Sequence, residues 1–226
     1  ELALFKKYIQ KRIEGFSAAA IIGKKEFMGL TLKVNEQVLI PRPDTETWLE
    51  KVIQYYRNKT GLKVADLGTG SGAILVGFLY YCRDAVGVGV DISTEALKIA
   101  EENGQNLKIT DRVEWRQGDY LKAFDEEDIF DGIFSNPPYI PTKDIGGLSR
   151  EVKHEPRLAL DGGTDGLYFY HLLAKGAAEH LKPGGFLAVE FGIGQATDIL
   201  EMFRKSAQYE LSLIHISEPT RQAEIS

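Results

Sequence analysis

The sequence predicts an α/β fold in which a mostly parallel β-sheet is covered by helices on both faces. Three observations predict it. From residue 62 onward, short apolar segments alternate with longer amphipathic or apolar ones, which is the pattern of strands alternating with helices. The short segments are largely apolar, as strands buried in a parallel sheet are. A glycine-rich turn also joins the first strand to the next helix, a frequent ligand-binding junction in such sheets.

The predicted elements follow one another without a repeat or a low-complexity tract. We expect strands at residues 62–67, 85–90, 112–116, 129–135 and 186–191. We expect helices at residues 73–81, 94–106, 165–180 and 196–206, the third of which is stopped by a turn at 182–185.

Residues 1–40, which precede this alternation, predict additional structure outside the main domain. Residues 1–25 have apolar positions at helical spacing, and we interpret them as the last piece of a helical N-terminal domain. Residues 26–40 alternate apolar and polar side chains around the pair Asn35-Glu36. That pattern predicts a β-hairpin connector with its turn at this pair.

Prolines separate the hairpin from the next helix. Pro41 and Pro43 stop the strand, and Asp44 or Thr45 is expected to cap a helix. We expect residues 41–210 to form the main domain.

The last residues, 211–226, do not continue the alternation. Their sequence, LSLIHISEPTRQAEIS, resembles a translated sequencing adapter. We therefore interpret this tail as non-native and exclude it from functional reasoning, as a tag is excluded.

The composition excludes several classes of protein. The formal net charge of the 226 residues is −6, whereas nucleic-acid-binding proteins usually show a basic face. Cys82 is the only cysteine, which excludes a disulfide framework and fits a reducing cytoplasm. No apolar run reaches the roughly 18 residues of a membrane span. The scattered histidines predict no metal site. We expect a cytoplasmic protein without a membrane or a stable nucleic-acid partner.

The first strand leads into a loop that suits a cofactor. Its glycines let a ligand contact bare backbone, and the second strand ends in Asp91, whose carboxylate can bind the hydroxyls of a ribose. An acid at the start of the loop would repel a pyrophosphate but tolerates a cationic amino-acid group. This favours S-adenosylmethionine over a dinucleotide. The loop comprises Asp66, Leu67, Gly68, Thr69, Gly70, Ser71 and Gly72.

The third strand leads to the triplet Gly118-Asp119-Tyr120. A carboxylate and an aromatic ring at this place can hold an adenine by hydrogen bonding and stacking. Plain turn chemistry is the alternative interpretation. The position in line with Asp66 and Asp91 favours the adenine.

The fourth strand ends in Asn136-Pro137-Pro138-Tyr139. The two prolines stiffen the turn and leave the Asn136 side chain and the Pro137 carbonyl as directed acceptors. Two acceptors suit a planar NH2 group, because they orient its nitrogen and stabilise the positive charge that develops there. Tyr139 offers an aromatic face. A simple turn is the alternative, but the order of motifs favours catalysis by Asn136, Pro137 and Tyr139.

These motifs resemble the class I methyltransferases that act on exocyclic amino groups. Within that group, the chain looks like the peptide chain release factor glutamine methyltransferases. The resemblance covers roughly residues 20–210 and rests on VLIPRPDTE at 38–46, VADLGTGSGAI at 64–74, SNPPYIP at 135–141 and EVKHEPRLALDGGTDGLYFY at 151–170. It implies a Rossmann-like class I sheet, an N-terminal helical domain and a final antiparallel strand pair, in whose place the tail 211–226 stands.

The resemblance also implies an activity and a set of contacts. The family methylates the side-chain nitrogen of glutamine in the Gly-Gly-Gln loop of release factors. Carried over by motif, residues 66–70 cradle the methionine end of S-adenosylmethionine, Asp91 holds the ribose, and Tyr120 lies by the adenine. Residues 136–139 bind the glutamine amide, with Asn136 also near the cofactor. In the first stretch, Arg42, Thr45 and Glu46 either close over the site or serve only the hairpin exit and helix start.

Two other functions remain open at this point. An adenine-N6 methyltransferase acting on DNA or RNA shares the motif and flips its base, but the sequence between Tyr139 and Asp165 lacks a sizeable basic insert for target recognition. A non-catalytic scaffold is the other candidate, although mere cofactor binding does not require the two amine acceptors of the Asn136–Tyr139 motif.

Overall fold

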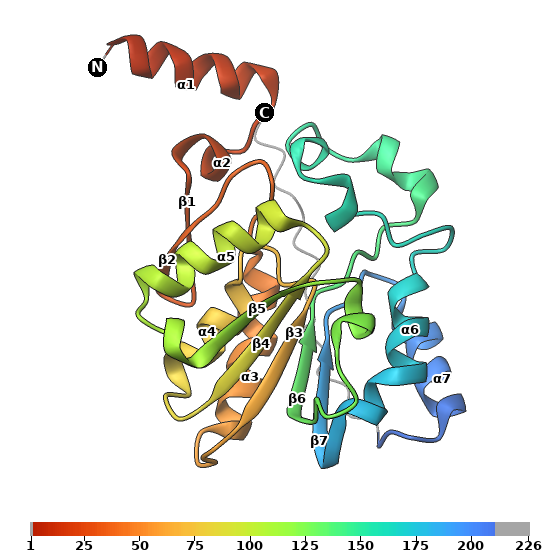
Figure 1. The fold of residues 1–226 in the computed structure, drawn as a ribbon. Coiled ribbons are helices and arrows are strands. Elements are labelled where there is room, and N and C mark those ends of the chain that lie inside the picture. The colour runs from red at the N-terminus through yellow and green to blue at the C-terminus, as the bar shows by residue number, and fades with distance from the viewer. Residues whose placement is uncertain (1, 211–226) are drawn as a thin grey trace.

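A five-stranded parallel sheet forms the centre of the molecule (Figure 1). The structure is a computed structural model that describes residues 2–210. The sheet order is β5-β4-β3-β6-β7, and all four pairings are parallel. The chain therefore moves outward from β3 to β5 and then crosses to β6 on the other side. The strands are β3 (Lys63–Leu67), β4 (Val86–Asp91), β5 (Val113–Gln117), β6 (Phe130–Ser135) and β7 (Leu181–Val189).

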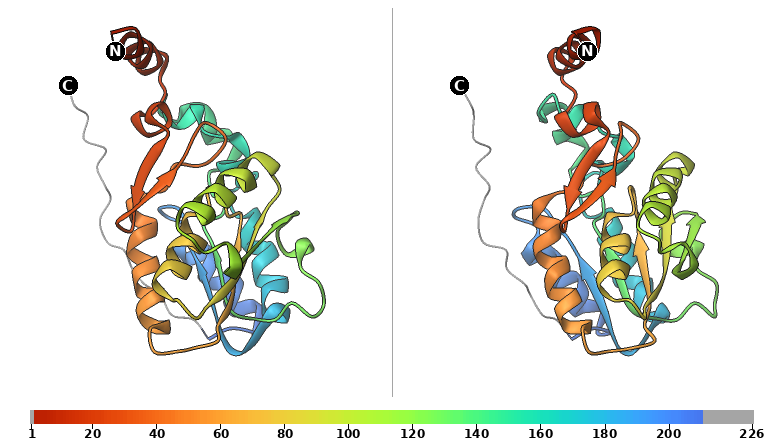
Figure 2. Two further views of the ribbon diagram at one scale, coloured as in Figure 1. Left: turned by 60° about the vertical axis from the view of Figure 1, so that its left-hand side comes forward. Right: turned by 90° about the vertical axis from the view of Figure 1, so that its left-hand side faces the viewer.

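Helices cover both faces of this sheet, which confirms the predicted Rossmann-like fold class. Two hydrophobic clusters fill the two interfaces: one includes residues of α3 and α4, and the other includes residues of α6 and α7. Helix α5 packs beside α4 and along β5, and Figure 2 shows the layers from two sides. The helices are α3 (Pro43–Tyr56), α4 (Ala73–Tyr81), α5 (Thr94–Asn106), α6 (Tyr168–Gly176) and α7 (Ala196–Ser206).

The hairpin exists, but its turn was predicted in the wrong place. It consists of β1 (Lys24–Phe27) and β2 (Leu30–Lys33), with Met28 and Gly29 at the turn. Both turn residues have positive φ angles, of 53° and 71°, as the favoured two-residue hairpin turn requires. Asn35, where the turn was expected, instead accepts a hydrogen bond from the Gln37 N–H at 2.8 Å in the segment that leaves the hairpin.

The start of α3 also differs from the prediction. The residue that precedes the helix is Arg42, and Pro43 occupies the first helical turn. Proline suits this position because its φ angle is already helical and no N–H partner is needed there. Asp44 and Thr45 therefore lie inside the helix and do not cap it. Asp44 still favours the helix electrostatically, as an acid in the first turn.

The segment around β7 is less regular than expected. Helix α6 is shorter than the predicted 165–180, and a 3₁₀ turn at Ala177–His180 follows it. Strand β7 then begins at Leu181 and includes the residues expected to form a turn. The register slips between the pairs Phe130–Leu181 and Gly132–Phe186, so the turn is absorbed as a bulge. The strand ends at Val189, before Glu190.

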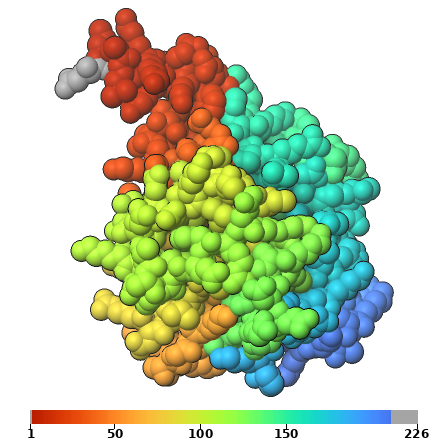
Figure 3. Space-filling view, in the orientation of Figure 1, coloured from red at the N-terminus to blue at the C-terminus, as the bar shows by residue number. Residues whose placement is uncertain are grey.

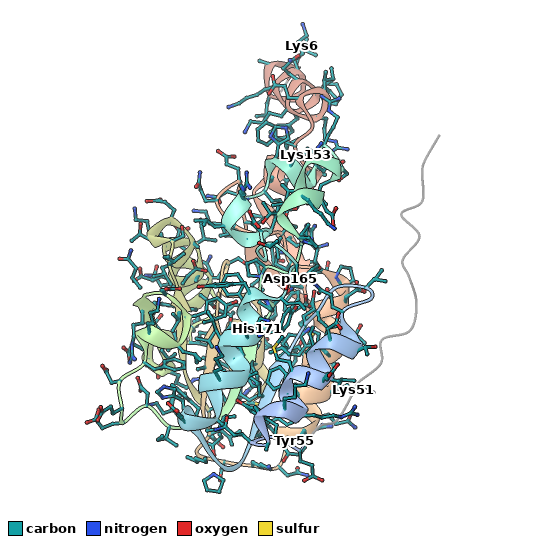
Figure 4. The ribbon with its side chains drawn as sticks, turned by 90° about the vertical axis from the view of Figure 1, so that its right-hand side faces the viewer. Lys6, Lys51, Tyr55, Lys153, Asp165 and His171 are labelled. Atoms are coloured by element: carbon teal, nitrogen blue, oxygen red, sulfur yellow. The ribbon has the colours of Figure 1, made fainter. Side chains whose placement is uncertain are left out.

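Two helices precede the hairpin, α1 (Leu2–Glu14) and α2 (Ala18–Ile22). Helix α1 stands away from the body, as the space-filling view shows (Figure 3), whereas Ala19 and Ala20 of α2 pack against the hydrophobic cluster that includes Val34 and Ile99. Side chains of the segment 150–154 form hydrogen bonds with the backbone carbonyls at the end of α1. In one of them, Arg150 Nη2 donates to the Ile13 carbonyl at 2.9 Å. Figure 4 shows Lys153 of this segment directly below the helix that carries Lys6.

The proposed division of the chain into 1–25, 26–40 and 41–210 remains a prediction, and the tail 211–226 lies outside the described residues. Among the helices of residues 2–210, none has the length and apolar character that crossing a membrane requires.

Candidate active site

The loop after β3 is tied to the end of β4. The backbone N–H groups of Gly68 and Thr69 both donate to the Val90 carbonyl at 2.9 Å. Gly68 and Gly70 have φ angles of 71° and 56°, a region that only glycine enters at no cost. The loop then turns into α4 at the carboxyl edge of the sheet, and Gly68 and Gly70 are its partly exposed residues.

Asp66, the last but one residue of β3, is fully buried. Its Oδ2 accepts a hydrogen bond from the Thr69 hydroxyl at 2.6 Å, while Oδ1 has no partner among residues 2–210. Burial, helped by the nearby Asp91 carboxylate, raises the pKa of Asp66 to about 7. A buried carboxylate oxygen without a partner is costly, and a cationic or donor group of a ligand in the loop would satisfy it.

Asp91 closes β4 beside this loop. Its Oδ2 accepts from the Gly70 N–H at 2.8 Å, and its Oδ1 accepts from the Ser93 N–H at 2.9 Å. Burial raises the pKa of Asp91, and these backbone donors oppose the shift. Each carboxylate oxygen retains a further lone pair. The side chain is thus fixed in direction and still able to accept hydrogen bonds from a ligand.

Asp119 and Tyr120 follow β5. Asp119 pairs with Lys122 at 2.6 Å near the surface. Tyr120 is only 8% exposed, and its hydroxyl lies 3.2 Å from Oγ of Ser135. Its ring packs on Phe169 with 4.5 Å between the centroids. Tyr120 also lies against the loop, since a Cβ atom on Gly68 would be 3.2 Å from its hydroxyl, and its contact with an adenine stays a prediction.

The Asn136–Tyr139 motif leaves β6 at the same edge of the sheet. Pro137 and Pro138 are buried. The turn is braced at its exit, because the Ile140 N–H donates to the Leu160 carbonyl at 3.0 Å and the Ile140 carbonyl accepts from the Gly162 N–H at 2.9 Å. Gln195 Nε2 also donates to the Tyr139 carbonyl at 2.9 Å. Burial and the neighbouring Glu190 raise the pKa of Tyr139 to about 12, so its phenol stays protonated at neutral pH.

Glu190, directly after β7, is a site residue that the sequence analysis missed. Its Oε2 accepts from the Thr45 hydroxyl at 2.6 Å and from Nε1 of Trp48 at 3.0 Å. Thr45 in turn accepts from Nδ2 of Asn136 at 3.2 Å. Burial raises the pKa of Glu190. A signal was present in the sequence, because Glu190 is an acid inside the apolar run 186–191.

Arg42 and Glu46, the other two residues singled out in the stretch 38–46, bind residues outside the Asn136–Tyr139 motif. Arg42 forms a double hydrogen bond with both carboxylate oxygens of Glu155, at 2.8 and 2.7 Å. That pair joins the start of α3 to the segment 151–170. Glu46 accepts from the Met28 N–H at 3.2 Å and so anchors the hairpin turn. Of the three residues considered for closing over the site, only Thr45 contacts the Asn136–Tyr139 motif through a hydrogen bond.

The site thus has two halves along one edge of the sheet. Asp66 and Asp91 lie at the ends of β3 and β4, while Asn136 and Glu190 lie at the ends of β6 and β7. Strand order places the boundary between the halves at β3 and β6, a location where ligands bind in open α/β sheets. Within residues 2–210, no cluster of three His, Cys, Asp or Glu side chains is placed to hold a metal ion.

Comparison with known proteins agrees with this arrangement. Residues 58–190 match the family model described as a methyltransferase domain. Among solved structures, a methyltransferase from Pyrococcus furiosus is similar with a TM-score of 0.57 and 22% identity, covering 87% of this chain and 85% of the other. A ribosomal protein L11 methylase from Lactobacillus delbrueckii subsp. bulgaricus is similar with a TM-score of 0.54 and 20% identity, covering 75% and 71%. Fold and site together define a class I methyltransferase.

Similarity to curated proteins identifies the family within the class I methyltransferases. The release factor glutamine methyltransferase of Bradyrhizobium diazoefficiens is 44% identical over 211 residues, which are 92% of this chain and 70% of that protein. The chain belongs to the family of release factor glutamine methyltransferases.

Proposed function

We propose that this chain transfers a methyl group from S-adenosylmethionine to the side-chain amide nitrogen of a glutamine in a peptide chain release factor. The observation that carries the proposal is the pairing, at one sheet edge, of a cofactor loop that contains an unsatisfied buried carboxylate with a rigid turn that offers amide acceptors. The family membership reported above supports the same substrate.

The residues present fit the cofactor. The unpartnered Oδ1 of Asp66 calls for a donor or cation, and the ammonium group of the methionine end is one. In the loop Leu67, Gly68, Thr69 and Gly70, the two glycines are partly exposed beside it, and Asp91 offers acceptors for ribose hydroxyls. When bound, S-adenosylmethionine supplies an electrophilic methyl group on a sulfonium centre.

The other half of the site fits an amide acceptor. A glutamine side-chain nitrogen is a weak nucleophile because its lone pair is delocalised into the carbonyl group. Oδ1 of Asn136 and the carbonyl of Pro137 can each accept one N–H of that amide, which orients the nitrogen and stabilises the positive charge developing there. Pro138 holds the turn rigid. Tyr139, protonated and partly buried, lines the acceptor side with an aromatic face.

The direct test is incubation of the chain with S-adenosylmethionine and a release factor, followed by peptide mass spectrometry. We expect one added methyl group on the glutamine of the Gly-Gly-Gln loop and none on a release factor in which that glutamine is alanine. Methylation of adenine in DNA or RNA instead, with an unmodified release factor, would contradict the proposal.

Asn136→Ala tests the roles within the site. We expect methyl transfer to fall by roughly 10²-fold or more, the scale for removing a preorganised polar group at a reacting centre. Cofactor affinity, measured by calorimetry, should stay within a few-fold. Asn58, exposed in the turn after α3, provides the matched control, and Asn58→Ala should behave like the unchanged chain. Full activity of Asn136→Ala on the release factor would rule out the assigned role.

A further inference from the structure

One oxygen of Glu190 receives two hydrogen bonds from α3. Its Oε2 lies 2.6 Å from Oγ1 of Thr45 and 3.0 Å from Nε1 of Trp48. The indole N–H of Trp48 can only donate, so Oε2 must act as an acceptor. Thr45 has a single hydroxyl proton, and its short contact with Oε2 directs that proton to Glu190.

The consequence for Asn136 follows from donor and acceptor chemistry. With its proton committed, Oγ1 of Thr45 has only lone pairs for other neighbours. The group that lies 3.2 Å from Oγ1 is the amide of Asn136, which must therefore present its NH2 end. The opposite end of the amide is Oδ1, which takes part in no hydrogen bond formed within residues 2–210.

We propose that Glu190 and Thr45 are positioning residues that set the orientation of the Asn136 amide, with its oxygen rather than its NH2 group facing the acceptor. The inference rests on the proposed function for the identity of that acceptor. An Asn136 side chain turned by 180° would present donors to the NH2 group of a glutamine, which also donates. The relay from Trp48 through Glu190 and Thr45 to Asn136 therefore selects the productive one of two orientations of similar shape.

Burial makes this relay effective. Thr45 is 3% exposed and Trp48 is 6% exposed, so water does not compete freely for their hydrogen bonds. Thr45 and Trp48 lie on α3, Asn136 directly follows β6, and Glu190 directly follows β7. The hydrophobic cluster that includes Trp48 and Phe134 holds these elements together. Each member is fixed independently of the substrate.

The first test removes the relaying hydroxyl. Thr45→Val nearly preserves the shape, and we expect kcat for glutamine methylation to fall roughly ten-fold or more, as for a lost preorganised polar group. Cofactor affinity should stay within two-fold, and Thr45→Ser should recover most of the lost rate. Thr47→Val is the matched control, because Thr47 lies on the same helix, is exposed and donates only to the Pro43 carbonyl. An unchanged kcat in Thr45→Val would overturn the proposal.

A double-mutant comparison separates positioning from general packing. If Thr45 acts through Asn136, adding Thr45→Val to Asn136→Ala should lower the remaining rate by less than about two-fold, since coupled residues are non-additive. If Thr45 only packs α3 against the sheet, the two losses should multiply, and the proposal fails. Glu190→Gln, which keeps an acceptor oxygen, should be milder than Glu190→Leu.

A third measurement needs no substrate. In protein labelled with ¹⁵N, the side-chain NH2 signal of Asn136 can be identified by its loss in Asn136→Ala. We expect its hydrogens to exchange with deuterium several-fold more slowly in the unchanged chain than in Thr45→Val. Equal exchange would contradict the relay. An unmethylated release factor would contradict the proposed function alone, because the exchange comparison would still decide the orientation.

Discussion

The carboxyl group of Asp66 has the most unusual environment of the described site. Desolvation by burial raises its pKa to about 7, and the nearby Asp91 adds to the shift while Thr69 opposes it. In the free protein, Asp66 is therefore mostly neutral at pH 6 and mostly ionised at pH 8. A bound ammonium group favours the ionised form, so the affinity for a ligand with an amino-acid end should depend on pH.

We expect the affinity for S-adenosylhomocysteine, which shares that amino-acid end, to rise between pH 6 and pH 7.5. The increase should be several-fold and at most about ten-fold, as linkage to one group with a pKa near 7 allows. Calorimetry at the two pH values measures it. Asp66→Asn should lower the affinity at pH 7.5 and flatten the profile, whereas an equally steep profile in this variant would assign the titration to another group.

Single residues of the site were predictable to different degrees. Asp66, Asp91 and Asn136 each end or follow a buried strand, and that position can be recognised along the chain. Glu190 has the same position, but its role depends on Thr45 and Trp48, which lie about 140 positions earlier and meet it only through the packing of α3 on the sheet. No spacing rule in one sequence contains that contact.

At the scale of elements, strand β4 depends on glycine residues that leave room for a side chain of the neighbouring strand. Its sequence alternates valine and glycine, and a Cβ atom on Gly89 would lie 2.4 Å from Cζ3 of Trp115 on the adjacent β5. The ring of Trp115 thus lies directly over the backbone of β4, and a side chain at position 89 would displace it.

Gly89→Ala should therefore destabilise the protein by about 1–3 kcal/mol, the usual cost of overpacking a core. Urea unfolding followed by circular dichroism measures the change as a lower midpoint. Gly146→Ala is the control, because a Cβ atom there meets nothing within 4 Å, and its midpoint should be nearly unchanged. Equal midpoints for both variants would mean that Trp115 moves aside without cost.

The positions of most helices and strands could be predicted, because the pattern of apolar residues along the sequence largely determines them. Helices α4, α5 and α7 have the predicted bounds, since each carries a continuous or periodic apolar pattern. The hairpin turn at Met28-Gly29 and the bulge in β7 were not predicted. Both depend on backbone geometry set by the neighbouring strand, through positive φ angles and shifted pairing, and periodicity does not encode either.

At the scale of the whole molecule, a charged cluster ties distant segments together at the end of the sheet opposite the site. Asp128, just before β6, accepts from Lys63 Nζ at 2.9 Å and also bonds Arg116. Its side chain is 8% exposed. Although desolvation opposes the change, the hydrogen bonds from Arg116 and Lys63 lower the pKa of Asp128 to about 2.

A carboxyl group with a lowered pKa in the folded state stabilises the protein above its unfolded pKa, which is about 4. This contribution, on the order of 2 kcal/mol, should be lost as the pH falls from about 4 to about 2. We expect Asp128→Asn to lower the free energy of unfolding at pH 6 and to differ less from the unchanged chain at pH 3. Urea titrations at both values test this, with Asp84→Asn as the control because Asp84 is an exposed aspartate far from this cluster in sequence. A difference that does not shrink with acid would exclude ionisation as the cause.

The crossing of the chain from β5 to β6 also has an evolutionary consequence. In the proposed function, residues 63–120 carry the loop and the acids assigned to the methyl donor, whereas residues 130–190, with α3, carry the groups assigned to the acceptor. Because the strands of the two portions pair with each other only between β3 and β6, substitutions in the acceptor portion can alter the recipient of the methyl group while the strands that carry the donor loop stay the same. The ribosomal protein L11 methylase, by its name a modifier of another protein, keeps the same architecture at 20% identity.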